Sequence, residues 1–145
     1  MVWDFDTHSV AKYVLFFPRL LPSLSHADWH VPKLDLVVIT NNRPESLRRL
    51  LESLQKGSYF GDRLHLYVNV EQTADEDTMA YVHSLPWSHG DLHLRHRVIL
   101  GGLLPAIVES WYPPSNDSYG LILEDDVEVS PMFYAWVKMA LLQYR

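Results

Sequence analysis

The chain has 145 residues, which corresponds to one domain or less, and 48% of them are apolar, a fraction ordinary for a folded core. Its formal charge of -6 does not favour binding to nucleic acid. The absence of cysteine excludes disulfide bonds and thiolate chemistry. No apolar run approaches the roughly 20 residues that span a bilayer.

Residues 1–33 mix aromatic residues and prolines without a sustained period, which predicts an irregular N-terminal arm packed on a domain that covers residues 34–145. Leu34–Thr40 is an almost wholly apolar, β-branched run, typical of a strand covered on both faces. A helix is expected next, because Pro44 precedes four leucines at positions i, i+3, i+4 and i+7, and Gly57 follows them.

The middle of the chain continues this alternation. Leu64–Val70 predicts a second strand, and acidic residues then open a helix that runs to about Leu85. Leu92–Val98 alternates between apolar and polar residues, which favours a third strand nearer an edge of the sheet. Pro105–Trp111 is expected to form a short helix.

The last part of the chain begins with the apolar run Tyr119–Leu123, read as a buried fourth strand. Ser130 and Pro131 then cap a last helix. Its expected buried residues are Phe133, Trp136, Val137 and Leu141. This helix reaches the end of the sequence without a stop signal, so we expect a fold truncated at its C-terminus. The alternation of strands and helices predicts an α/β fold with a mainly parallel sheet and right-handed crossovers.

Three consecutive carboxylates, Glu124, Asp125 and Asp126, directly follow the fourth apolar run. They repel one another, and a divalent cation that prefers hard oxygen ligands would relieve the repulsion. Neighbouring side chains on a strand point to opposite faces, so at most two of the three meet one ion. We expect Asp126 to be the metal ligand, with Asp125 and Glu124 supporting it or touching hydroxyls of a ligand. The alternative is a solvated strand end whose acids simply begin a turn.

Two segments carry a resemblance to a known family: Asn-Arg-Pro-Glu-Ser-Leu at residues 42–47, and Glu-Asp-Asp-Val-Glu-Val-Ser-Pro-x-Phe at residues 124–133. Together they resemble the nucleotide-sugar-binding half of GT-A-fold glycosyltransferases, which is Rossmann-like, with the greatest likeness to the N-acetylglucosaminyltransferase I type and to family-2-like enzymes. The likeness covers roughly residues 34–145. It implies that Asp126 binds Mn²⁺ (or Mg²⁺) across the diphosphate of a UDP-sugar and that Asp125 contacts the ribose.

The same resemblance implies further nucleotide contacts. Arg43 lies in the loop where the family has a nucleotide-contacting arginine, although an ordinary surface arginine beside a helix start is an equal alternative. Thr40 and Asn41 would face the uridine. The family's acid that reads the uracil N–H corresponds to Glu71 or Gln72, and the register leaves both open.

Gly101, followed by a second glycine, would let the backbone approach the nucleotide closely, or would form an ordinary turn. A zinc site is rejected, because His93 and His96 are three apart on an expected strand and therefore point to opposite faces.

The function that follows is metal-assisted transfer of a sugar from a UDP-sugar to a glycan or another hydroxyl acceptor. In the family, the acceptor site and the general base lie beyond the metal motif, so they are expected downstream of Arg145 and the chain by itself is expected to be inactive. The alternative is a truncated, non-catalytic domain that binds a nucleotide sugar or docks to a partner.

A sugar nucleotidyltransferase is disfavoured, because its first turn needs a glycine-rich, basic signature that Asn41–Pro44 lacks. Members of the resembled family are usually anchored in the Golgi by a transmembrane helix, which implies a Golgi lumen or membrane location, although this sequence shows no such helix.

Overall fold

The structure is a computed structural model that describes residues 28–144. Arg145 and most of the expected N-terminal arm, residues 1–27, lie outside the described part of the chain. Strands and helices alternate along it in the order β1 (Lys33–Thr40), α3 (Pro44–Gln55), β2 (Leu66–Val70), α4 (Glu76–His83), β3 (Leu92–His96), α5 (Leu103–Val108), β4 (Ser118–Glu124) and α6 (Phe133–Tyr144).

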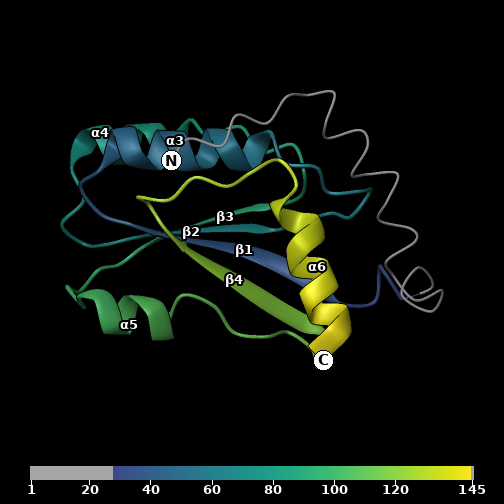
Figure 1. Cartoon of the computed structure of the whole chain (residues 1–145). Coiled ribbons are helices and arrows are strands. Elements are labelled where there is room, and N and C mark those ends of the chain that lie inside the picture. The colour runs from purple at the N-terminus through teal and green to yellow at the C-terminus, as the bar shows by residue number, and fades with distance from the viewer. Residues whose placement is uncertain (1–27, 145) are drawn as a thin grey trace, which may run out of the picture.

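The four strands form one sheet in the order β3-β2-β1-β4, and every neighbouring pair is parallel. Figure 1 shows α3 and α4 on one face of the sheet, α5 on the other, and α6 beside the end at which the strands begin. The α/β, Rossmann-like fold predicted from the sequence is therefore confirmed. The sheet grows from β1 to β3 in one direction, after which β4 returns to the opposite side of β1, so the strand order reverses between β1 and β4.

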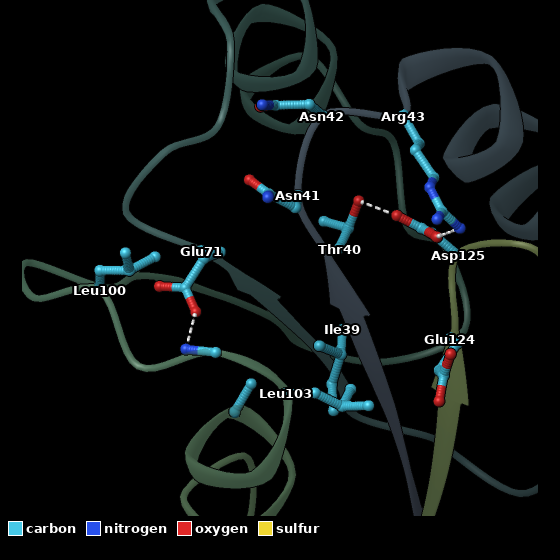
Figure 2. A pocket seen from close by; sticks show the side chains of 12 residues that line it. Ile39, Thr40, Asn41, Asn42, Arg43, Glu71, Leu100, Leu103, Glu124 and Asp125 are labelled. Atoms are coloured by element: carbon cyan, nitrogen blue, oxygen red, sulfur yellow. Dashed lines mark hydrogen bonds and ion pairs between the residues drawn. The ribbon is translucent and has the colours of Figure 1, made fainter.

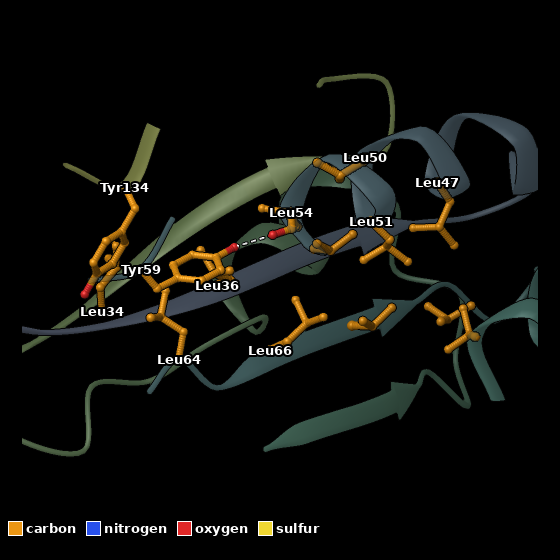
Figure 3. Packing of buried hydrophobic residues seen from close by; sticks show 14 residues of the cluster. Leu34, Leu36, Leu47, Leu50, Leu51, Leu54, Tyr59, Leu64, Leu66 and Tyr134 are labelled. Carbon is orange, nitrogen blue, oxygen red and sulfur yellow. Dashed lines mark hydrogen bonds between the residues drawn. The ribbon is translucent and has the colours of Figure 1, made fainter. Parts of the chain in front are cut away.

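The core lies between this sheet and α3 (Figure 3). Alternate residues of β1 and β2 face the leucine stripe of α3, and these leucines are almost completely buried, as the helical period predicted. Tyr59 closes the core beside the helix end, where its hydroxyl donates a hydrogen bond to the Leu54 carbonyl oxygen over 2.6 Å. Because successive residues of a strand point to opposite faces, this packing leaves the other residues of β1 on the opposite face of the sheet.

The expectation that the fourth strand is buried was wrong. Leu121 and Leu123 pack against the core, but Ile122 is 40% exposed and Glu124 is exposed as the last residue of the strand. The reason is the place of β4 in the sheet, because it is an edge strand among the described residues.

The last helix also differs from the prediction. Trp136 is 69% exposed instead of buried, and the fully buried side chains of α6 are Tyr134, Ala135 and Lys138. The Lys138 ammonium donates to the Pro32 carbonyl oxygen over 2.7 Å and lies 3.1 Å from the Asp62 carboxylate. The hydrogen bond to Pro32 and the ion pair with Asp62 select the buried face of a helix that is apolar on almost every side.

Two smaller differences concern the short helix α5. It begins at Leu103, after Gly102, and ends at Val108, whereas the sequence predicted residues 105–111. Proline is tolerated in the first turn of a helix, so Pro105 does not mark its first residue.

No helix within residues 28–144 has the length and hydrophobicity that a membrane crossing requires.

Candidate functional site

A cavity of about 400 Å³ opens at the carboxyl ends of β1 and β4. This is the point where the strand order reverses, the usual ligand site of an open parallel sheet. One wall is apolar and the rest is polar (Figure 2). The apolar lining residues are Ile39, Leu100, Leu103 and Ala106, and the polar ones are Thr40, Asn41, Asn42, Arg43, Glu71, Glu124 and Asp125, with Gly102 between them.

Thr40 and Asp125 join the two strands at this edge. The Thr40 hydroxyl donates to Asp125 Oδ2 over 2.8 Å, and both residues are buried. Thr40 is the last residue of β1, and Asp125 directly follows β4. A buried carboxylate needs such donors, because burial without them is costly. The hydrogen bond therefore fixes the orientation of the Asp125 side chain at the polar end of the cavity.

Arg43 links the two aspartates that follow β4. Its Nη1 atom lies 3.5 Å from Asp125 Oδ1 and also 3.5 Å from Asp126 Oδ2. The arginine side chain is 59% exposed and the Asp126 side chain 54% exposed, whereas that of Asp125 is 8% exposed. Asp126 does not line the cavity itself, so it joins the site through its neighbour and through the shared arginine.

These two carboxylates fit a divalent cation. Their oxygens converge on one positively charged nitrogen, which marks a position where a cation is electrostatically favourable. Residues 28–144 contain no group of three or more histidine, cysteine or acidic side chains arranged to hold a metal. A pair of carboxylates is nevertheless the protein share that Mg²⁺-type sites use, since water and substrate phosphates complete the coordination there.

Glu71 lines the cavity on the side away from these aspartates. Its carboxylate accepts hydrogen bonds from the backbone N–H groups of Gln72 (2.8 Å), Gly102 (3.1 Å) and Gly101 (3.5 Å), and it lies 3.6 Å from Arg97 Nε. The Gln72 N–H group, followed by the two glycine N–H groups and the arginine, lowers the pKa of Glu71 although burial opposes this. An ionised Glu71 therefore ties the end of β2 to the segment before α5.

The sequence left open whether Glu71 or Gln72 belongs to the site, and the structure distinguishes the two. Glu71 lines the cavity, whereas Gln72 is exposed and does not line it. Gly101 does not line it either, but Gly102 does, with a φ of 72° that favours glycine. A Cβ atom on Gly101 would lie 2.5 Å from Arg97 Nη2, so this glycine leaves room for the arginine that faces Glu71.

The loop after β1 is braced by its two asparagines. Asn41 Oδ1 accepts a hydrogen bond from the Thr73 hydroxyl over 3.1 Å, and Asn42 Oδ1 accepts one from the Asp75 backbone N–H over 2.8 Å. Asp75 is in turn the N-cap of α4. The loop that carries Arg43 is thus fixed to the neighbouring strand–helix connection.

Sequence reasoning missed Asn42 and the apolar wall of the cavity. Leu100 and Leu103 are 61% and 59% exposed, which is unusual for leucines. The available signal was the placement of large apolar residues directly around a glycine pair in a turn, where polar residues are the rule.

Comparison with solved structures finds the same fold in S. aureus TarS, in a crystal structure of its residues 1–349. The TM-score is 0.61 at 14% sequence identity, over 77% of this chain and 33% of that chain. TarS is a family-2-like glycosyltransferase, but at this identity the similarity shows the fold alone. This chain spans about a third of the TarS chain. No curated protein matches the sequence.

One protein-family model matches residues 41–145, a stretch that contains Arg43, Glu71 and both aspartates after β4. The matched residues make up most of the chain and extend from the loop after β1 to its last residue. The chain therefore belongs to the family described as the SPBC1E8.03c C-terminal domain.

Proposed function

We propose that this chain binds the nucleotide-sugar donor, a UDP-sugar, of a metal-dependent glycosyl transfer to a hydroxyl group of a glycan or another acceptor. One observation carries the proposal: the cavity at the reversal of strand order combines an apolar wall with Arg43 and Asp125 at its polar end, and Asp126 lies beside them, 3.5 Å from Arg43 Nη1. A nucleoside diphosphate has the same division, with a planar base at one end and two phosphates at the other. The fold shared with TarS supports this assignment.

The base would lie against the apolar wall. Ile39, Leu100 and Leu103 offer a surface for a planar ring, and Glu71 lies at the same end of the cavity (Figure 2). A carboxylate has about four acceptor positions, and backbone N–H groups take three of those on Glu71. The remaining position would accept the imide N–H of uracil.

The diphosphate would lie at the polar end. Asp126 and Asp125 would hold the Mn²⁺ or Mg²⁺ ion, which would supply positive charge against the negative charge of the departing UDP. Arg43 would place its guanidinium against phosphate oxygens, for which its planar donor geometry is suited. Thr40 keeps Asp125 aimed at this point through its hydroxyl.

Binding without transfer is the second candidate function. Asp125 is already engaged by Thr40 and Arg43, and Glu71 by three backbone N–H groups. Asp125 and Glu71 are therefore not placed to remove a proton from an acceptor hydroxyl, which leaves Glu124 as the further carboxylate that lines the cavity. Release of UDP from a UDP-sugar in the presence of hydroxyl acceptors distinguishes transfer from binding alone.

The test of the proposal is calorimetric titration of UDP into the protein with and without Mn²⁺. We expect binding that requires the metal and is lost in Asp126→Ala. Glu128→Ala is the matched control, because Glu128 lies two residues further on, is 62% exposed and pairs with Arg49 instead. Unchanged circular dichroism would show that each variant is folded. Absence of UDP binding by the folded wild-type protein under all conditions would contradict the proposal.

A further inference from the structure

Arg43 supplies the positive charge beside the two aspartates that would hold the cation of the proposed function. Its Nη1 atom is equidistant, at 3.5 Å, from one oxygen of Asp125 and one of Asp126. Asp125 is a buried carboxylate whose other contact in this group is the neutral hydroxyl of Thr40. A nearby positive charge therefore stabilises both aspartates, and in this arrangement the arginine supplies it.

The hold of Arg43 on this pair is loose. Charge-assisted N–H···O contacts are typically about 2.7–2.9 Å long, and both contacts here are longer, at 3.5 Å. The arginine side chain is also 59% exposed, so little packing fixes it in place. A divalent cation carries twice the charge and approaches carboxylate oxygens to about 2.1 Å. The direct electrostatic attraction of these oxygens is therefore stronger for the divalent cation than for the guanidinium.

We propose that Arg43 and the divalent cation compete for Asp125 and Asp126. Arg43 offsets half of the charge of the two carboxylates before the cation binds, and cation binding would release the guanidinium toward the diphosphate. This inference rests on the proposed function and assigns Arg43 two successive partners in the same site. The arginine accordingly acts against metal binding and in favour of nucleotide binding.

The two roles predict effects of opposite sign when Arg43 is removed. Without nucleotide, loss of the competing charge strengthens metal binding. With the metal present, loss of a phosphate contact weakens UDP binding. A purely structural role for the arginine would lower both affinities together.

The experiment measures Mn²⁺ affinity without nucleotide by electron paramagnetic resonance, which reports free Mn²⁺, and then UDP affinity at saturating Mn²⁺ by calorimetry. The variants are Arg43→Ala and Arg43→Gln. Arg49→Ala is the matched control, because the two arginines are equally exposed (59% and 60%) and Arg49 pairs with Glu128, close to Asp126 in sequence. We expect both Arg43 variants to bind Mn²⁺ about fivefold more tightly than wild type, and Arg49→Ala to bind it as wild type does.

The inference is overturned if the Arg43 variants bind Mn²⁺ no more tightly than wild type while the wild-type protein binds Mn²⁺ and UDP through Asp126; in that case the proposed function stands. An equal gain in Arg49→Ala also overturns it, because the effect would then reflect net charge alone. If no variant binds Mn²⁺ and the wild-type protein does not bind UDP, the proposed function fails together with the inference.

Discussion

Thr40 and Asp125 are separated by 85 positions in the sequence, and a 2.8 Å hydrogen bond from the threonine hydroxyl to Asp125 Oδ2 joins them. Each residue stands at the end of a parallel strand, so the bond spans the point where the strand order reverses. It adds a side-chain link between the first strand and the acidic segment to the backbone pairing of Ile39 with Glu124.

This hydrogen bond gives the first prediction. Thr40→Val keeps the shape of the side chain but removes the donor to a buried carboxylate, so we expect the free energy of unfolding to fall by about 2 kcal/mol. Urea denaturation measures the change, and Thr40→Ser, which keeps the hydroxyl, should recover most of the loss. Equal stability of wild type and Thr40→Val would show that the bond contributes nothing.

Much of the fold was predictable, since the period of apolar residues directly reports which side of an element is buried. The leucines of α3 and the apolar run of β1 are examples, and both lie where they were expected. Trp136 shows the limit. Helix α6 is apolar on nearly all sides, so its period does not select a buried face, and the long-range contacts of Lys138 with Pro32 and Asp62 do.

The candidate site was only partly predictable. The acids after β4 were recognisable because three consecutive carboxylates are locally unfavourable. The shared position of Arg43 between Asp125 and Asp126 was not, since it depends on how β1 and β4 pair across more than eighty positions. The partners of Glu71 are backbone N–H groups, which every sequence contains, so no side-chain pattern identifies them.

The second prediction concerns the segment before α5. Glu71→Gln removes the carboxylate that accepts from Gly101 and Gly102, so we expect faster hydrogen exchange of these amides and weaker UDP binding. Glu109→Gln is the control, because Glu109 binds Arg97 at 2.8 Å but accepts from neither glycine, and its variant should exchange like wild type. Equal exchange in all three proteins would mean that Arg97 holds the segment without Glu71.

The third prediction concerns the buried lysine of α6. Lys138→Met removes one partner of an ion pair and leaves the Asp62 carboxylate without its ammonium, so we expect a loss of about 3 kcal/mol in unfolding free energy. Thermal and urea denaturation measure it. Lys56→Met, at an exposed lysine after α3, is the matched control and should change stability by less than about 0.5 kcal/mol.

The fourth prediction is a pH dependence that arises from Asp62. Burial raises the pKa of this carboxyl, but hydrogen bonds from Tyr134, His30 and Lys138 outweigh the effect, so its pKa in the folded protein lies below the usual value. A lowered folded pKa means that Asp62 contributes its full stability above the unfolded value, near pH 4, and loses it as the pH falls through the folded pKa.

The measurement is urea denaturation between pH 7 and pH 3 of wild type, Asp62→Asn and a control. Other carboxylates also titrate in this range, so the informative quantity is the difference between wild type and Asp62→Asn, which should shrink as the pH falls below about 4. Asp91→Asn is the control, because Asp91 is 59% exposed in its pairs with Arg63 and His65, and surface pairs of this kind contribute little. If the difference does not change with pH, the pKa of Asp62 is the same in the folded and the unfolded protein, and its three partners stabilise the fold only by packing.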